Sequence, residues 1–131
     1  MIINTLNDSL IRIKNGYKLK FGFVLVLKSK RIISFLDVLY LEGFIRGYSL
    51  SAEKNKIKVL LKYTDGNKKV LRETKNISKS GKRTYVSVKN LWLLDSISKN
   101  GCFILSTSKG MMSSNRALKE NIGGELLCYV A

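Results

Sequence analysis

Two stretches in the first half of the chain carry apolar residues at helical spacing, with a capping residue before them and a glycine after. The first runs from Asn4 or Thr5 to Gly16, and the second runs from Ser29 to Gly43. Three shorter stretches are rich in strand-forming residues or alternate apolar and charged positions: residues 21–27, 44–50 and 56–63. The first half therefore predicts the order helix, strand, helix, strand, strand.

After a predicted turn at residues 65–67, the helical period weakens and short strands dominate. Strands are predicted at residues 70–77, 83–88, 102–107 and 125–130, and short helices at residues 91–97 and 114–120, the latter capped by Ser113. The pattern predicts an α+β fold of two small lobes. Residues 1–64 would form the N-terminal α/β lobe, and residues 65–131 a C-terminal β-rich lobe with short helices.

The charge of the chain indicates which class of partner it binds. Of the 131 residues, 24 are Lys or Arg and 9 are Asp or Glu, a formal net charge of +15. Such an excess opposes compaction, so we expect a polyanionic partner, with nucleic acid favoured over an anionic membrane. No apolar run reaches the roughly 18 residues of a membrane span, and no long basic amphipathic helix is predicted. We therefore expect no membrane partner.

Residues for catalysis or metal binding are scarce. The chain has no histidine, and its two cysteines, Cys102 and Cys128, lie far apart among apolar neighbours. Buried thiols are the favoured interpretation, ahead of a disulfide or a metal pair. Ser106 to Lys109 fits an S-x-x-K signature, but the S-D-N and K-T-G elements that accompany it are missing. We expect neither an enzyme nor a metal, cofactor or small-molecule substrate.

The most informative stretch is Ser106-Thr107-Ser108-Lys109-Gly110, which follows an apolar strand. Short hydroxyl side chains on a tight turn can approach the shallow minor groove of A-form RNA, which displays ribose hydroxyls. A lysine beside them can neutralise a phosphate. The stretch therefore predicts an RNA contact, and the alternative is an ordinary polar hairpin turn.

Several stretches together resemble the small-subunit ribosomal protein S8 family. The most specific are residues 106–113, residues 116–117 and the run Gly-Gly-Glu-Leu-Leu-Cys-Tyr-Val-Ala at 123–131. Weaker likenesses occur at residues 8–16, 42–45 and 78–85, so the resemblance covers nearly the whole chain. Departures include Ile11 for a polar residue, Lys99 for a glycine, Ser80 for a proline and Asn121 for a glycine. Asparagine tolerates the left-handed conformation, so the turn at Asn121 should survive.

The resemblance implies a protein that binds the central domain of small-subunit rRNA, next to other ribosomal proteins, and supports subunit assembly and translation. The RNA contacts that it implies are Ser106, Thr107, Ser108, Lys109 and Gly110, with Tyr85, Gly123, Gly124 and Glu125 beside them. Basic residues are predicted to face phosphates at Arg12, Lys14, Lys82 and Arg83. The alternative is a non-ribosomal basic RNA-binding module or a translational repressor, since some members of the family repress an mRNA that resembles the rRNA site.

Some of these residues have a second interpretation. Tyr85 could stack on a base or pack in the core, and Gly123-Gly124 could admit RNA closely or form a plain turn. Glu125 could accept hydrogen bonds in the site or be a surface acid. Trp92 is interpreted as a core or protein-interface residue.

The composition also bears on location. The abundance of Lys, Asn, Ile and Ser is typical of an AT-rich genome, and residues 1–8 resemble neither a secretory signal nor a transit peptide. We expect a ribosomal protein of the mitochondrial matrix, encoded in the organelle, with a bacterial cytoplasm as the alternative.

Overall fold

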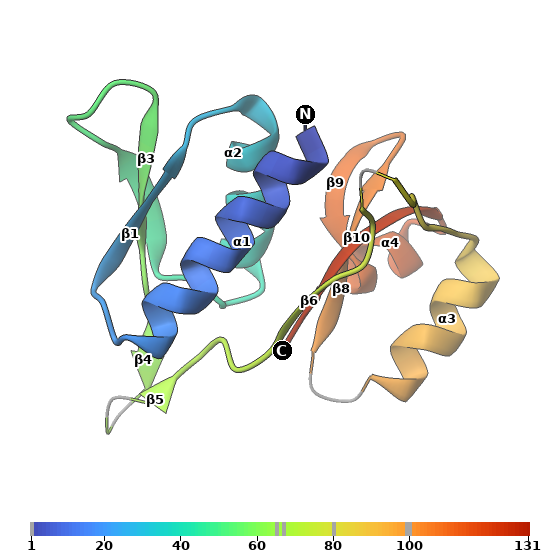
Figure 1. Ribbon diagram of the computed structural model, residues 1–131. Coiled ribbons are helices and arrows are strands. Elements are labelled where there is room, and N and C mark those ends of the chain that lie inside the picture. The colour runs from blue at the N-terminus through green and yellow to red at the C-terminus, as the bar shows by residue number, and fades with distance from the viewer. Residues whose placement is uncertain (1, 65, 67, 80, 99–100) are drawn as a thin grey trace. The chain divides into compact units, whose positions relative to one another are not determined.

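The chain forms two compact units, shown in the computed structural model of Figure 1. The structure describes residues 2–64, 66, 68–79, 81–98 and 101–131. Unit 1 is Met1–Arg72 and unit 2 is Glu73–Ala131. The predicted α+β class is confirmed, because each unit combines helices with antiparallel strands. We expected the division at residue 65, but the short pair β4 (Tyr63–Thr64) and β5 (Lys68–Lys69) groups with unit 1.

Unit 1 packs two helices on a three-stranded sheet. Its helices are α1 (Ile2–Lys18) and α2 (Lys30–Leu41), and its main strands are β1 (Phe23–Leu27), β2 (Gly47–Leu50) and β3 (Lys56–Leu60). The strand order is β1-β3-β2, antiparallel throughout. The helix α1 lies along β1 and against α2 (Figure 1). The apolar residues Leu6, Leu10 and Ile13, which recur at helical spacing in α1, are buried, as are the alternating residues Ile57 and Val59 of β3.

The bounds of α1 differ from the prediction at both ends. The helix begins at Ile2, ahead of the predicted cap, and it continues past Gly16 to Lys18. Gly16 lies inside the helix at a close contact with β1, where a Cβ would come within 2.4 Å of the Val24 side chain. The helix ends at Lys18, and the turn that follows contains Lys20, whose φ of 58° is left-handed; Phe21 N donates to Gly16 O at 2.9 Å across this turn. Gly16 therefore permits close packing of α1 on β1, and it does not mark the end of the helix as predicted.

The ends of α2 agree with the prediction. Ser29 is the N-cap, and its hydroxyl oxygen accepts from Ile32 N at 3.1 Å. Gly43 has a φ of 82° and ends the helix, as expected of a left-handed C-terminal residue. Near the end of this helix Tyr40 is 55% exposed, whereas Phe35 is buried in the core.

Unit 2 is built around β10, which pairs with three other strands. The strands are β6 (Thr74–Asn76), β7 (Tyr85–Val86), β8 (Cys102–Thr107), β9 (Gly110–Ser113) and β10 (Gly124–Val130), and the helices are α3 (Val88–Ile97) and α4 (Ser114–Lys119). The order is β6-β10-β8-β9, with β7 also pairing with β10. The pattern did not predict β9 and overestimated the lengths of β6 and β7. Both predicted helices are present, and Ser113 caps α4.

The core of unit 2 joins both helices to the sheet through Leu91, Leu105, Met112, Ala117 and Leu126. Asn121 follows α4 with a φ of 56°, which confirms that asparagine supports this turn. The cysteines are buried thiols, as predicted, and burial raises the pKa of Cys128. Among the described residues there is no group of three or more metal-ligating side chains and no helix suited to span a membrane.

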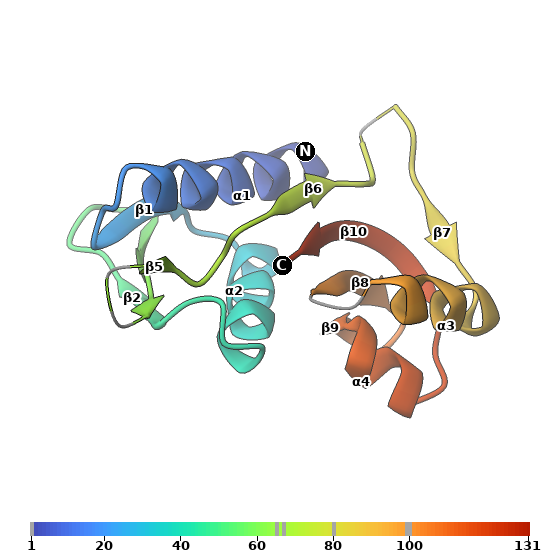
Figure 2. The same ribbon diagram turned by 90° about the horizontal axis from the view of Figure 1, so that it is seen from below.

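The strand β10 contains a bulge that Ser78 secures. The register of β10 on β8 shifts between Leu126 and Cys128, and the strand is strongly curved in Figure 2. Buried Ser78 donates its hydroxyl to Leu126 O at 2.5 Å and accepts from Thr84 N at 3.1 Å. One side chain thus ties the segment between β6 and β7 to the interrupted part of the ladder.

Substitution Ser78→Ala should destabilise unit 2, since it removes the hydrogen-bond partner of the part-buried Thr84 amide and of the buried Leu126 carbonyl. We expect a loss of about 1–3 kcal/mol in the free energy of unfolding, measured by urea denaturation. Ser96→Ala is the matched control, because Ser96 is exposed on α3 and alanine favours helix. Equal stability of the two variants would contradict this role of Ser78.

Candidate nucleic-acid interface

The Ser-Thr-Ser-Lys turn (Ser106–Gly110) is the tip of the hairpin formed by β8 and β9. Thr107 pairs with Gly110, which leaves Ser108 and Lys109 exposed at the tip. Thr107 Oγ1 donates to Gly110 O at 2.7 Å and accepts from Lys109 N at 3.2 Å. Gly110 has a φ of 110°, a conformation that side chains with a Cβ rarely adopt. The Thr107 hydroxyl therefore organises the turn, and its only proton is already donated.

Three predicted residues lie in one row across the sheet. Glu125 on β10 pairs with Ser106 on β8 and with Tyr85 on β7. Directly opposed residues of antiparallel strands project from the same face, so these side chains are neighbours. Tyr85 is 71% exposed, which excludes the alternative of a packed core tyrosine. We call Tyr85, Glu125 and Ser106 the sheet row. It adjoins the turn through Ser106.

The acid in the sheet row is compensated by a cation. Glu125 is buried, with a side chain only 9% exposed, and both of its carboxylate oxygens lie near Arg83 Nη1, at 3.3 and 3.4 Å. Arg83 itself is 44% exposed. The pair explains how an acid is tolerated in a basic region, and it excludes the interpretation of Glu125 as a solvated surface acid.

The glycine pair, Gly123 and Gly124, has a packing role within the protein. A Cβ on Gly124 would come within 2.4 Å of Ser106 O, and one on Gly123 within 2.5 Å of Val86 O. Real Cβ atoms do not come this close to a carbonyl oxygen, so these positions require glycine whether or not RNA is present. Close approach of RNA to this backbone stays a prediction.

The remaining predicted cations lie in different places. Lys82 is exposed, and it exchanges two backbone hydrogen bonds of 2.9 Å with Lys79. Arg12 and Lys14 are exposed on α1 in unit 1, and Arg12 pairs with Asp8 at 3.1 Å. The structure therefore gathers the turn, the sheet row, Arg83 and the glycine pair in unit 2, and leaves Arg12 and Lys14 on the other unit.

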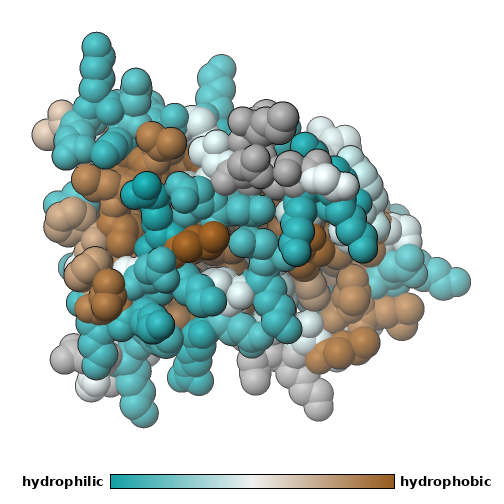
Figure 3. Space-filling model, viewed as in Figure 1, coloured by the Kyte–Doolittle hydropathy of each residue, from teal (hydrophilic) through white to brown (hydrophobic). Residues whose placement is uncertain are grey.

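Unit 2 also has an apolar surface that the sequence analysis did not identify. Trp92, Leu93 and Ile97 on α3 are each at least 60% exposed, and Figure 3 shows apolar side chains gathered over this helix at the lower right. Trp92 is thus not a core residue. The helical period alone gave no signal of this, since α3 has apolar residues on several faces and buries mainly Leu91.

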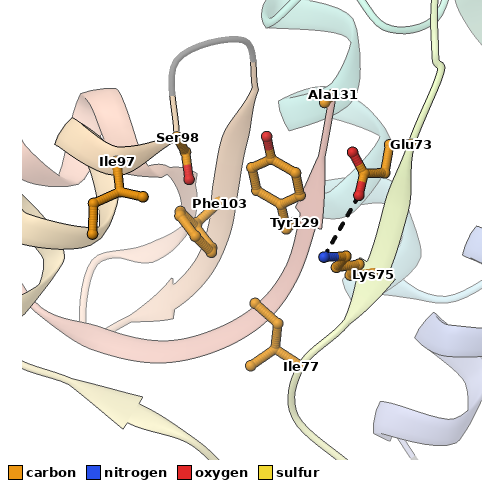
Figure 4. A pocket seen from close by; sticks show the side chains of 8 residues that line it. All are labelled: Glu73, Lys75, Ile77, Ile97, Ser98, Phe103, Tyr129 and Ala131. Carbon is orange, nitrogen blue, oxygen red and sulfur yellow. Dashed lines mark ion pairs between the residues drawn. The ribbon is translucent and has the colours of Figure 1, made fainter.

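A hollow of about 540 Å³ lies near the end of α3 and is shown in Figure 4. Phe103 and Tyr129 line it with ring centroids 5.1 Å apart. The one cation among its described lining residues, Lys75, lies 3.6 Å from the Glu73 carboxylate. This hollow is thus less suited to bind phosphate than the Ser-Thr-Ser-Lys turn.

Comparisons with known proteins agree on one family. A family model described as "Ribosomal protein S8" matches residues 4–131. Small ribosomal subunit protein uS8 of Bartonella henselae is 44% identical over 128 residues, which covers 95% of each chain. The protein of the same name from Rhizobium rhizogenes is 42% identical with the same coverage, and that from Mycoplasmopsis agalactiae is 40% identical over 98% of each chain.

Substitution Gly124→Ala should displace β10 from β8, because the added methyl group meets Ser106 O rather than a flexible side chain. We expect the free energy of unfolding to fall by about 1–3 kcal/mol. Gly81→Ala is the control, since a Cβ there meets nothing within 4 Å. Thermal melts that coincide for wild type and Gly124→Ala would refute the packing role.

Proposed function

This chain belongs to the ribosomal protein S8 family and has a structural, non-enzymatic role in the small ribosomal subunit, and on this premise we propose that it binds small-subunit rRNA directly through the Ser-Thr-Ser-Lys turn and the sheet row. The observation that carries the proposal is the exposed tip, where Ser108 and Lys109 project beside Ser106, Tyr85 and the compensated acid Glu125.

The side chains at this place suit the minor groove of a folded RNA. Serine hydroxyls are short and can both donate to and accept from ribose 2′-hydroxyls, so the backbone of the turn can come close to the groove. Tyr85 presents an exposed ring that can stack on an unpaired base or a ribose. Lys109 and Lys82 would neutralise phosphates of the bound RNA, and these contacts would fix the position of the turn on it.

The roles of the turn residues then differ. Thr107 shapes the tip, since its hydroxyl is bonded to both Gly110 and Lys109, whereas Ser106 and Ser108 supply hydroxyls to the RNA. Arg83 orients the Glu125 side chain, so that the carboxylate can accept a further bond from a base amino group.

We place the target in the central domain of the rRNA, where binding would support assembly of the subunit next to other ribosomal proteins. This placement is supported by the resemblance of residues 106–131 to the family. The test is sedimentation: the chain should stay with the small subunit in high-salt gradients. Release from the particle, together with tight binding to an mRNA, would favour the translational repressor instead.

The proposed compartment is the mitochondrial matrix, with an organelle gene. The abundance of Lys, Asn, Ile and Ser supports it, while the relatives compared above are bacterial. Fractionation of the source cells decides between the two: recovery in purified mitochondrial ribosomes is the expected result, and recovery from a bacterial lysate would overturn it.

Substitution of Ser106 or Ser108 by alanine should weaken binding to a central-domain transcript by about 1–2 kcal/mol each, the contribution of lost hydrogen bonds in a desolvated contact. Filter binding at fixed salt measures the affinity, and circular dichroism checks the fold. Ser96→Ala on α3 serves as the control. Affinities equal to wild type for both turn variants would remove the turn from the interface.

Substitution Lys109→Ala should lower the slope of log affinity against log salt by about one, because one phosphate contact and its counterion release are lost. Lys89→Ala on α3 removes the same charge away from the turn and should leave the slope unchanged. If the two slopes coincide, Lys109 makes no phosphate contact.

A further inference from the structure

Unit 1 contains a hollow with an unusual concentration of positive charge, which we call the basic hollow. Its volume is about 700 Å³. Two segments form it: the end of α1, with Tyr17, and the segment that contains β5. The cations that line it are Lys18, Lys20, Lys68, Lys69 and Arg72. All five are exposed, and none was identified in the sequence analysis.

The described cations of the basic hollow take part in none of the ion pairs seen in unit 1. The described lining residues of the hollow include no acid, and the ion pairs seen in unit 1 involve Arg12 and Lys56 instead. Like charges held around one concave surface repel each other, and the apolar interior beneath them focuses their field. Such a surface attracts an anion strongly.

Helix electrostatics explain only part of the cluster. Cations near the C-terminus of α1 stabilise the helix dipole, which accounts for Lys18 and Lys20. Lys68, Lys69 and Arg72 come from a different segment and gain nothing from this dipole. Two segments separated by more than forty residues thus supply cations to one place.

Lys20 also has an unfavourable backbone conformation. Its φ of 58° lies in the left-handed region, which costs a residue with a Cβ roughly 1 kcal/mol relative to glycine. Glycine would end α1 with less strain. A lysine at this position therefore points to a use for its charge beyond folding.

The floor of the hollow is held in place by hydrogen bonds. Tyr17 donates its hydroxyl to Phe44 O at 2.5 Å and accepts from Lys62 N at 3.0 Å. The ring of Tyr63 packs edge-on against that of Tyr17, with centroids 5.4 Å apart, and its hydroxyl donates to Phe21 O at 2.6 Å. The cations therefore project from an ordered base, which lowers the entropy cost of binding.

We propose that the basic hollow is a second RNA-binding site, which holds the sugar–phosphate backbone and does not read sequence. The proposal rests on the proposed function for the choice of RNA as partner, and it adds a contact on unit 1. An acidic protein is disfavoured, because lysine is depleted from protein interfaces and the one aromatic ring among the described lining residues, Tyr17, is buried. Lysine and arginine are the usual phosphate ligands.

The test compares full-length variants on a small-subunit rRNA transcript and on an unrelated duplex RNA. Lys20→Gly should keep or raise the melting temperature, yet weaken binding to both RNAs roughly five- to tenfold at about 0.1 M salt and lower the salt slope by about one. The triple variant Lys68→Gln, Lys69→Gln, Arg72→Gln should lower the slope by two to three.

The control triple variant is Lys28→Gln, Lys30→Gln, Lys54→Gln, which removes equal charge from exposed positions of unit 1 outside the hollow. If both triple variants lower the salt slope equally, the loss of affinity reflects net charge and not the hollow. That result would overturn the proposal. If the hollow variants bind RNA like the wild type, but reconstituted subunits that contain them lack another protein, the hollow binds an acidic protein instead.

The two sites are separable in the same experiment. If the hollow variants lose affinity and Ser106→Ala does not, the hollow is an RNA site and the Ser-Thr-Ser-Lys turn is not. The reverse result retains the turn and rejects the hollow. Wild-type protein that binds neither RNA would reject both proposals.

Discussion

The candidate interface depends on the close packing of the glycine pair against neighbouring backbone. With no Cβ on Gly123 or Gly124, β10 lies against the carbonyl groups of Val86 and Ser106, at separations that no other residue permits. This packing sets the register in which Glu125 faces both Ser106 and Tyr85. The hydroxyl, the acid and the aromatic ring therefore come together as a consequence of main-chain geometry, from three separate strands.

Charge is organised differently in the two units. In unit 2, the acid of the sheet row is buried under Arg83, so a specific polar surface is built with its charge balanced. In unit 1, the basic hollow gathers cations with no acid among its described lining residues. The first arrangement suits recognition by shape and hydrogen bonds, whereas the second suits attraction of any phosphate backbone. A chain with a net charge of +15 can use both.

The departures from the family pattern can be judged against the structure. Asn121 adopts the left-handed conformation that glycine would provide, so the end of α4 is preserved. Ile11 is 47% exposed on α1, so the polar residue it replaces would face solvent and not the core. Ser80 and Lys99 lie outside the described residues. The family fold thus persists through substitutions that respect backbone conformation.

The sequence by itself determined the features that depend on neighbours along the chain. Helical spacing predicted α2 and α3, the capping residues Ser29 and Ser113 predicted the starts of α2 and α4, alternation predicted β3, and the Ser-Thr-Ser-Lys-Gly motif indicated the turn. Only the tertiary structure decided the rest. Position 16 within α1 requires glycine because Val24 fills the space beside it, and Lys20 meets Lys68 in one hollow because β5 returns to the end of that helix. These outcomes depend on contacts between distant segments, and local periodicity carries no information about such contacts.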